Sequence, residues 1–178
     1  LADAVAGQMV SDVPLGVFLS GGVDSSTVAA LMVASKRSRV RTFSIGFSDL
    51  DYDESSYARV VARHLDTEHH ELMVSTQDAL DIVPQLAEMY DEPFADSSQI
   101  PTHLISKLSR AYVTVALSGD GGDEVFAGYN RYTLGHGLGE RLATMPRFAR
   151  YGLAAALRAA PDGFIDAAAK LAPRHLRP

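Results

Sequence analysis

Two glycine-rich stretches carry the residue types best suited to chemistry. The first, SGGVDSS, spans residues 20–26, and the second, SGDGGDE, spans residues 118–124. Glycines allow a tight turn and the close approach of a ligand, while serine hydroxyls and the N–H groups of a following helix bind anions. Asp24 would repel a phosphate unless a hard cation such as Mg²⁺ lay between them. The first stretch therefore predicts a cradle for phosphate with Mg²⁺.

The second stretch adds three acidic residues, Asp120, Asp123 and Glu124. Carboxylates gathered beside Asp24 would suit a magnesium–polyphosphate site. Two simpler interpretations stay open. The first stretch could be an ordinary strand-to-helix turn in which Asp24 stabilises the helix start. The second could be a solvated acidic turn or a Ca²⁺ loop, although the spacing of an EF-hand is missing.

Two familiar phosphate motifs are absent from the sequence. No Gly-Lys pair occurs in the chain, so the Walker motif GxxxxGKS or GxxxxGKT is missing. The first stretch also lacks the GxGxxG spacing of dinucleotide-binding domains. The sequence therefore supports neither a Walker-type enzyme nor a dinucleotide-binding Rossmann domain.

The elements that must position these stretches alternate along the chain. Short apolar runs predict buried strands, and segments of helical period predict helices between them. The predicted strands are 15–20, 40–47, 67–74 and 112–119, and the predicted helices are 23–35, 54–65, 76–90 and 102–111. We expect Asp53 and Ser75 to cap two of these helices and Pro84 to kink one.

Alternation of strand and helix predicts an α/β fold whose parallel sheet has helices on both faces. Ligands of such sheets bind at the carboxyl ends of the strands. Both glycine-rich stretches follow a predicted strand directly, so we expect them at one edge. Residues 1–132 should form the nucleotide-binding domain, with a leading helix within 1–12, and residues 133–178 a helical tail.

Composition limits the classes of partner. The chain has 178 residues, a net charge of −6 and no cysteine. We therefore expect no nucleic-acid partner, no membrane partner, no disulfide and no thiolate site, and a cytoplasmic location. Because the first residue is Leu1, we expect a piece of a longer chain. His69 and His70 adjoin on a predicted strand, so they should face opposite ways and have structural roles.

Four segments resemble, in this order, the synthetase domain of glutamine-hydrolysing asparagine synthase. They are VPLGVFLSGGVDSS at 13–26, TFSIGF at 42–47, DEPFADSSQIPT at 91–102 and LSGDGGDEVFAGYNRY at 117–132. The first resembles the pyrophosphate loop of the N-type ATP pyrophosphatases, and alone it would also admit GMP synthetase, NAD synthetase or tRNA thiolation enzymes. The fourth narrows the choice to asparagine synthases and β-lactam synthetases.

The resemblance implies an adenine nucleotide alpha-hydrolase-like, Rossmann-like fold that uses ATP and Mg²⁺. Aspartate would react through β-aspartyl-AMP, with release of pyrophosphate, and ammonia would then give asparagine and AMP. The ammonia would come from glutamine through a glutaminase domain outside this chain. The resemblance is also compatible with a homodimer of the protein. The alternatives are a synthetase of another carboxylate acceptor, β-lactam-forming or peptide-modifying, and a nucleotide-binding module without chemistry.

The resemblance also implies roles for individual residues. Asp24 and Asp123 would bind Mg²⁺, and Asp120 would lie near the acyl-adenylate as the catalytic residue. The residues implied for ATP and pyrophosphate are Leu19, Ser20, Gly21, Gly22, Asp24, Ser25, Ile45, Ser118 and Gly119. Those implied, more weakly, for the acceptor pocket are Asp96, Ser97, Ser98 and Tyr129.

The resemblance covers residues 13–132 and leaves parts of the family pattern without a counterpart. The glutaminase domain of the family begins with a catalytic cysteine, which this chain lacks. No segment after Tyr132 matches the one that supplies a phosphate-binding lysine, and the tail 133–178 matches no family motif. We therefore expect the chain alone to be incomplete as an enzyme.

Overall fold

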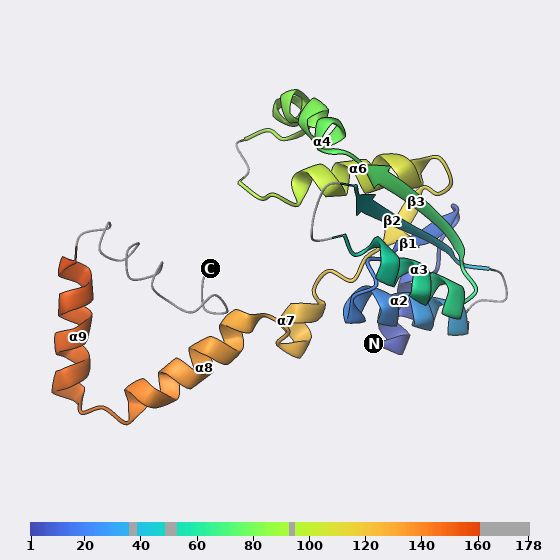
Figure 1. Cartoon of the computed structure of the whole chain (residues 1–178). Helices are drawn as coiled ribbons and strands as arrows, with labels where there is room; N and C mark the ends of the chain where they lie inside the picture. The colour runs from blue at the N-terminus through green and yellow to red at the C-terminus, as the bar shows by residue number, and fades with distance from the viewer. Residues whose placement is uncertain (36–38, 49–52, 93–94, 161–178) are drawn as a thin grey trace. The chain divides into compact units, whose positions relative to one another are not determined.

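The structure is a computed structural model, and it describes residues 1–35, 39–48, 53–92 and 95–160 (Figure 1). The chain divides into two compact units, Leu1–Phe126 and Ala127–Pro178. The described part of the second unit holds α8 (Asn130–Ala143) and α9 (Arg147–Ala159). The predicted division between residues 132 and 133 falls inside α8, and residues 161–178 of the predicted tail lie outside the described residues.

The first unit is built on a four-stranded parallel sheet. Its strands are β1 (Leu15–Phe18), β2 (Arg41–Phe47), β3 (Glu68–Val74) and β4 (Val115–Leu117), in the order β3-β2-β1-β4. In β1, Val17 is registered with Thr42 of β2 and with Leu117 of β4. The predicted α/β class with a parallel sheet is confirmed.

The strand β4 differs from its prediction. The apolar run at residues 112–119 predicts a long buried strand, whereas β4 has three residues and Val115 is 42% exposed. Among the described residues β4 pairs only with β1, so it is an edge strand. An apolar run can be assigned to a strand from sequence, but its burial depends on which strands lie beside it.

One face of the sheet is covered by α1 (Ala2–Gln8), α2 (Val23–Ser35) and α3 (Ser55–His64) (Figure 1). α1 ends at Gln8, earlier than the predicted segment 1–12. These helices share an apolar core, whose fully buried members are Val17, Leu19, Ala29, Met32, Val40 and Ala58. Burial of apolar side chains on one stripe of each helix holds this layer to the sheet.

The other face is covered by α4 (Thr76–Ile82), α5 (Leu86–Met89) and α6 (Gln99–Arg110). Ser75 caps α4 as predicted, because its hydroxyl accepts a hydrogen bond from Asp78 N while the Asp78 carboxylate accepts one from Ser75 N. Pro84 lies in a 3-10 turn, Val83–Gln85, that separates α4 from α5, so the single helix predicted for 76–90 is divided there. No described helix is long and apolar enough to cross a bilayer.

α6 begins at Gln99, three residues before its predicted start, and contains Pro101 in its first turn. Proline fits there because the first N–H groups of a helix have no intrahelical partner. Ser98 N donates a 2.8 Å hydrogen bond to the Asp96 carboxylate ahead of the helix. Because α6 leads to the amino end of β4, its own start lies at the carboxyl edge of the sheet (Figure 1).

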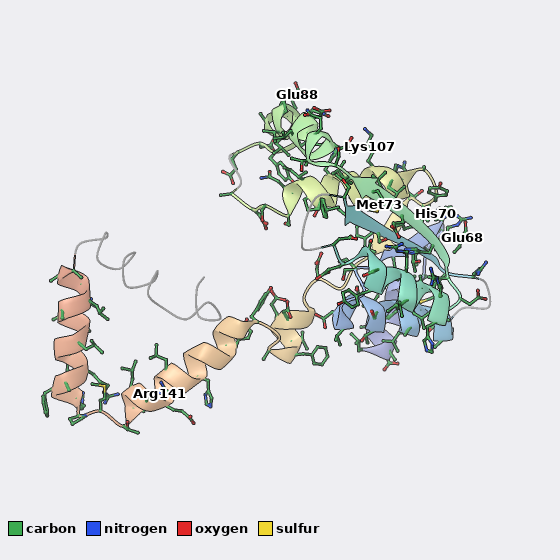
Figure 2. The ribbon with its side chains drawn as sticks, viewed as in Figure 1. Glu68, His70, Met73, Glu88, Lys107 and Arg141 are labelled. Atoms are coloured by element: carbon green, nitrogen blue, oxygen red, sulfur yellow. The ribbon has the colours of Figure 1, made fainter. Side chains whose placement is uncertain are left out.

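The two neighbouring histidines of β3 face opposite ways, as predicted. His69 lies 2.9 Å through Nδ1 from the Thr42 hydroxyl and 3.2 Å through Nε2 from the Ser44 hydroxyl. His70 instead stacks on Tyr112, with ring centroids 3.8 Å apart, and its Nε2 lies 3.2 Å from Glu68 Oε1 (Figure 2). Each imidazole therefore has structural partners.

The half-buried His69 predicts an acid-sensitive stability. Burial lowers the pKa of its imidazole, and the charges of His70 and Arg59 lower it further. An unfolded histidine binds a proton near pH ~6.5, so the unfolded state gains protons before the folded state does. The free energy of unfolding should therefore fall as the pH is lowered from neutral through this range.

Urea unfolding at several pH values between neutrality and pH ~5 tests this expectation. We expect His69→Gln, which can keep a hydrogen bond to Thr42, to flatten the pH slope. The control His64→Gln removes an exposed imidazole from α3 and should keep the slope. Asp53 and Asp78 also have lowered pKa values, because the carboxylates accept hydrogen bonds, but their stabilisation is lost only below pH ~4. Equal slopes in both variants would contradict the role of His69.

Candidate functional site

The first glycine-rich turn leads from β1 into α2 and is closed by its own serines. Ser20 N donates to Ser25 Oγ at 3.2 Å, and the two hydroxyl oxygens lie 3.0 Å apart. Gly22 N donates to Ser20 Oγ at 3.2 Å, and Ser25 Oγ donates to Gly22 O at 3.3 Å. These bonds hold two hydroxyls together at the start of α2, where the positive end of the helix dipole favours an anion.

The position of Gly21 cannot accommodate a side chain. Its φ of 88° lies in the left-handed region that favours glycine. A Cβ at this position would come within 2.6 Å of backbone atoms of Tyr57 and Ala58 in α3. The first turn therefore rests directly on the main chain of α3.

Ser26, the last member of the first stretch, has a buried hydroxyl. Its Oγ has no hydrogen-bond partner among the described residues. An unsatisfied buried polar atom of this kind costs about 1–3 kcal/mol.

The second glycine-rich turn packs directly on the first. A Cβ on Gly119 would lie 2.7 Å from Ser25 N, and one on Gly122 would lie 2.5 Å from the Asp24 carboxylate. Within the second turn, Ser118 Oγ donates to Asp120 Oδ2 at 3.0 Å. The prediction that both turns lie at one edge of the sheet is confirmed, and the glycines are what let them touch.

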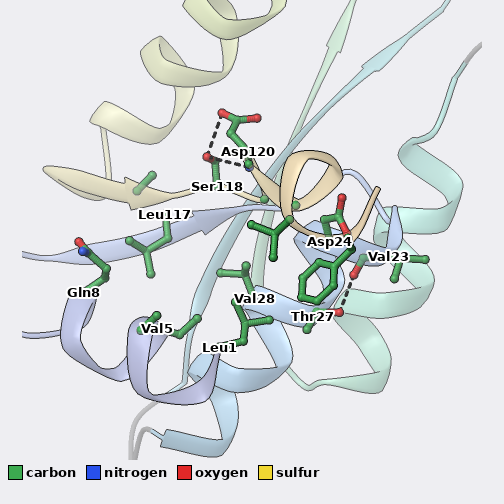
Figure 3. Close-up of a pocket in the computed structure, with 17 residues that line it drawn as sticks. Leu1, Val5, Gln8, Val23, Asp24, Thr27, Val28, Leu117, Ser118 and Asp120 are labelled. Atoms are coloured by element: carbon green, nitrogen blue, oxygen red, sulfur yellow. Dashed lines mark hydrogen bonds between the residues drawn. The ribbon is translucent and has the colours of Figure 1, made fainter. Parts of the chain in front are cut away.

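A pocket of about 790 Å³ opens beside this contact (Figure 3). Four of the predicted site residues line it, namely Asp24, Ser118, Gly119 and Asp120. The rest of the lining comes from α1, α2, β4 and α7 (Gly122–Phe126) and is largely apolar, with Val28 and Leu117 drawn in Figure 3. The pocket thus combines an apolar wall with two carboxylates and a serine hydroxyl.

The remaining residues predicted for ATP lie outside this pocket. The first turn contributes none of Ser20, Gly21, Gly22 or Ser25 to its lining. Leu19 is 1% exposed within the core, so only its main chain could contact a nucleotide. Ile45 lies inside β2 and packs against the core of the other face, under α4 and α6.

Of the four residues predicted for the acceptor pocket, three precede α6 and the fourth, Tyr129, belongs to the second unit. Asp96, Ser97 and Ser98 are exposed at the start of α6, at the same edge of the sheet, but do not line the pocket. The hydrogen bonds from Ser98 lower the pKa of the Asp96 carboxyl. Tyr129 belongs to the second unit, where its ring makes an edge contact with that of Tyr132, 5.5 Å between centroids.

The predicted magnesium ligands are Asp24 at the pocket and Asp123 in the first turn of α7. Within the described ranges, no three histidine, aspartate or glutamate side chains gather closely enough to hold a metal ion. Mg²⁺ is commonly bound by one or two carboxylates, with phosphate oxygens and water as the other ligands. Asp24 at the junction of the two turns fits that arrangement.

Comparison with known proteins identifies the family. The family model described as asparagine synthase matches residues 1–177. The chain belongs to the asparagine synthase family. The match also covers the tail 133–177, so the family resemblance extends beyond the 13–132 expected from motifs alone.

Three relatives of this asparagine synthase chain show how much of a full-length family member it corresponds to. A Methanocaldococcus jannaschii relative, whose name is that of a glutamine-hydrolysing asparagine synthetase, is 44% identical and covers 84% of this chain. Asparagine synthetase 1 of Bacillus subtilis is 39% identical over 73% of the chain, and asparagine synthetase B of Escherichia coli is 35% identical over 72%. The chain matches only 29%, 20% and 26% of these relatives.

A solved structure supports the fold. The chain resembles the NH3-dependent NAD synthetase of Campylobacter jejuni, with a TM-score of 0.50 and 18% identity. The similarity covers 72% of this chain and 57% of the synthetase. At this level of identity the likeness concerns the fold alone, and it agrees with the predicted fold class.

The contact between the turns predicts a sensitive glycine. Gly119→Ala would force a Cβ against the main chain of α2, and overpacking of this kind costs about 1–3 kcal/mol of unfolding free energy. Gly7→Ala in α1 is the control, because no atom lies within 4 Å of a Cβ at that position. This substitution should leave the free energy of unfolding unchanged or raise it. Urea unfolding of both variants measures the difference. A fully stable Gly119→Ala protein would contradict the close packing of the two turns.

Proposed function

We propose that this domain binds Mg-ATP where the two glycine-rich turns meet and uses it to convert aspartate to asparagine. The observation that carries the proposal is the direct packing of Gly119 and Gly122 on Asp24 and Ser25. It places carboxylates, serine hydroxyls and a helix start at the carboxyl edge of a parallel sheet, where such folds bind ligands. Membership of the asparagine synthase family supports the choice of reaction.

The proposed chemistry has two steps. In the first, a side-chain carboxylate oxygen of aspartate attacks the α-phosphorus of ATP, and pyrophosphate leaves to give β-aspartyl-AMP. In the second, ammonia attacks the acyl carbon, the carbon–oxygen bond breaks, and AMP leaves with that oxygen. Neither step needs a strong base on the protein, so positioning and charge neutralisation are the main requirements.

The residues at the junction suit these requirements. We assign the first turn, Ser20–Gly21–Gly22 with Ser25, to the departing pyrophosphate, because its hydroxyls and N–H groups gather at the start of α2. A magnesium ion bound with the nucleotide would neutralise phosphate charge, and Asp24 and Asp123 would hold it. The main chain at Ser118 and Gly119 would contact the nucleotide, and Asp120 would lie near the acyl-adenylate.

The wider reaction follows from the names of the relatives. Because they are glutamine-hydrolysing asparagine synthetases, we propose that glutamine supplies the ammonia through a glutaminase domain in another part of the same protein. The absence of cysteine in this chain is consistent with our placing of the reaction in the cytoplasm.

Removal of the Asp24 charge tests the nucleotide site. Asp24→Asn keeps the shape of the side chain, and loss of one partner of a bound charged group costs roughly 2–5 kcal/mol, so Mg-ATP should bind more than about tenfold more weakly. Asp81→Asn removes an equal charge from exposed α4 and should leave affinity unchanged. Calorimetric titration measures both. Equal affinities in the two variants would contradict the assigned role of Asp24.

An isotope experiment tests the reaction itself. The protein is supplied with Mg-ATP, ammonium and aspartate labelled with ¹⁸O in its side-chain carboxylate. Formation of β-aspartyl-AMP predicts that one labelled oxygen appears in AMP, and mass spectrometry measures it. Pyrophosphate release that needs a different carboxylate would select another acceptor, whereas ATP binding without pyrophosphate release under any acceptor would indicate a binding module.

A further inference from the structure

Beside the apolar core of this face, the part of β2 and β3 that lies beneath α3 carries polar side chains. Thr42 and Ser44 of β2 are 0% and 2% exposed, and they are registered with His69 and Glu71 of β3. The His69 ring lies within hydrogen-bond distance of both hydroxyls. This row of side chains is therefore a hydrogen-bonded seat for the helix.

Arg59 connects α3 to that seat. Its Nε lies 3.3 Å from Glu71 Oε2, and its Nη2 donates to Ser55 Oγ at 3.1 Å. Its Nε also lies 3.3 Å from Ser55 O, one turn earlier in the helix. A single guanidinium thus joins the start of the helix to the middle of β3.

The network continues to the carboxyl edge of the sheet. Ser55, which is 1% exposed, donates through Oγ to Asp53 Oδ2 at 2.8 Å and through N to Asp53 Oδ1 at 3.1 Å. Asp53 Oδ1 also accepts a 3.3 Å bond from Phe47 N at the end of β2. Asp53 therefore anchors the start of α3 through Ser55, but it is not the N-cap that was predicted: that position belongs to Glu54, whose side chain makes no capping bond.

This polar network contributes more to the position of α3 than to the free energy of folding. Partly exposed ion pairs contribute only about 0–1 kcal/mol, so Arg59, whose side chain is 45% exposed, adds little to the free energy of folding. Hydrogen bonds are directional, however, and a connected polar network allows fewer positions of the helix than apolar packing does. The network therefore sets where α3 lies along and above the sheet.

The position of α3 matters because the first glycine-rich turn rests on it. A Cβ on Gly21 would lie 2.6 Å from Tyr57 and Ala58, the two residues that precede Arg59. A Cβ on Gly46 would lie 2.9 Å from Ser55 Cβ, so the start of α3 is pressed equally closely onto β2. A small displacement of α3 would therefore displace the main chain of the turn.

We propose that Arg59 is a positioning residue for the first turn, acting through Ser55, Glu71 and the main chain of α3. The inference rests on the proposed function, because it assigns the residue to the same ATP site. The guanidinium of Arg59 pairs with Ser55 and Glu71, and its effect on Gly21 and Gly22 would pass through the main chain of α3.

The test compares Arg59→Met with Arg63→Met in the protein. Both changes remove a guanidinium from α3, but the Arg63 side chain makes no hydrogen bond or ion pair with the residues that the structure describes. We expect Arg59→Met to move the backbone amide NMR signals of Gly21 and Gly22 and to weaken Mg-ATP binding about tenfold, the equivalent of one charged hydrogen bond. Arg63→Met should leave the signals and the affinity unchanged.

A second variant keeps the test decisive if Arg59→Met fails to fold. Arg59→Lys keeps the charge opposite Glu71 but loses the fork that also binds Ser55, so the same signals should move in the same direction by less. Unmoved Gly21 and Gly22 signals in a folded Arg59 variant would overturn the inference, as would equal movement in Arg63→Met. If the amide signals move as expected but even the unaltered protein does not bind Mg-ATP, the proposed function fails and the positioning role of Arg59 stands.

Discussion

The site depends on one close approach of main chain to main chain. The turn after β4 lies against the start of α2 because Gly119 has no side chain, since a Cβ there would come within 2.7 Å of Ser25 N. A Cβ on Gly122 would likewise come within 2.5 Å of the Asp24 carboxylate. Neither turn alone gathers enough groups for a nucleotide. Their contact brings Asp24 together with Ser118 and Asp120 at the edge of one pocket.

The first turn is confined on two sides by backbone. Gly119 of the second turn packs against Ser25, while Tyr57 and Ala58 of α3 pack against Gly21. Its serines complete the enclosure by bonding to one another and to Gly22. A loop held in this way can bind phosphate without first being ordered, which removes part of the entropy cost of binding. The polar seat beneath α3 extends the same constraint into the sheet, because it fixes the helix that carries one of the two walls.

The lining of the pocket includes Asp24 but none of the serines of the first turn. The pocket is largely apolar, with Val28 and Leu117 in its lining, whereas the turn presents hydroxyls and N–H groups. Such a division suits a reaction between a polyphosphate and a second substrate, with Asp24 where the two regions meet. The chain spans less than a third of each of the three relatives reported above.

Sequence alone determined the order of strands and helices, the parallel sheet and the placing of both turns at one edge, because these follow from periodicity, turn residues and the rules of α/β topology. It also identified the family, although the motifs reached only residue 132. Tertiary structure decided what depends on neighbours distant in the chain. The side chain of Leu19 is buried in the core, β4 is an edge strand, and Arg59 of α3 forms an ion pair with Glu71 of β3. Burial and pairing of this kind arise from packing between elements, which no local pattern of residues encodes.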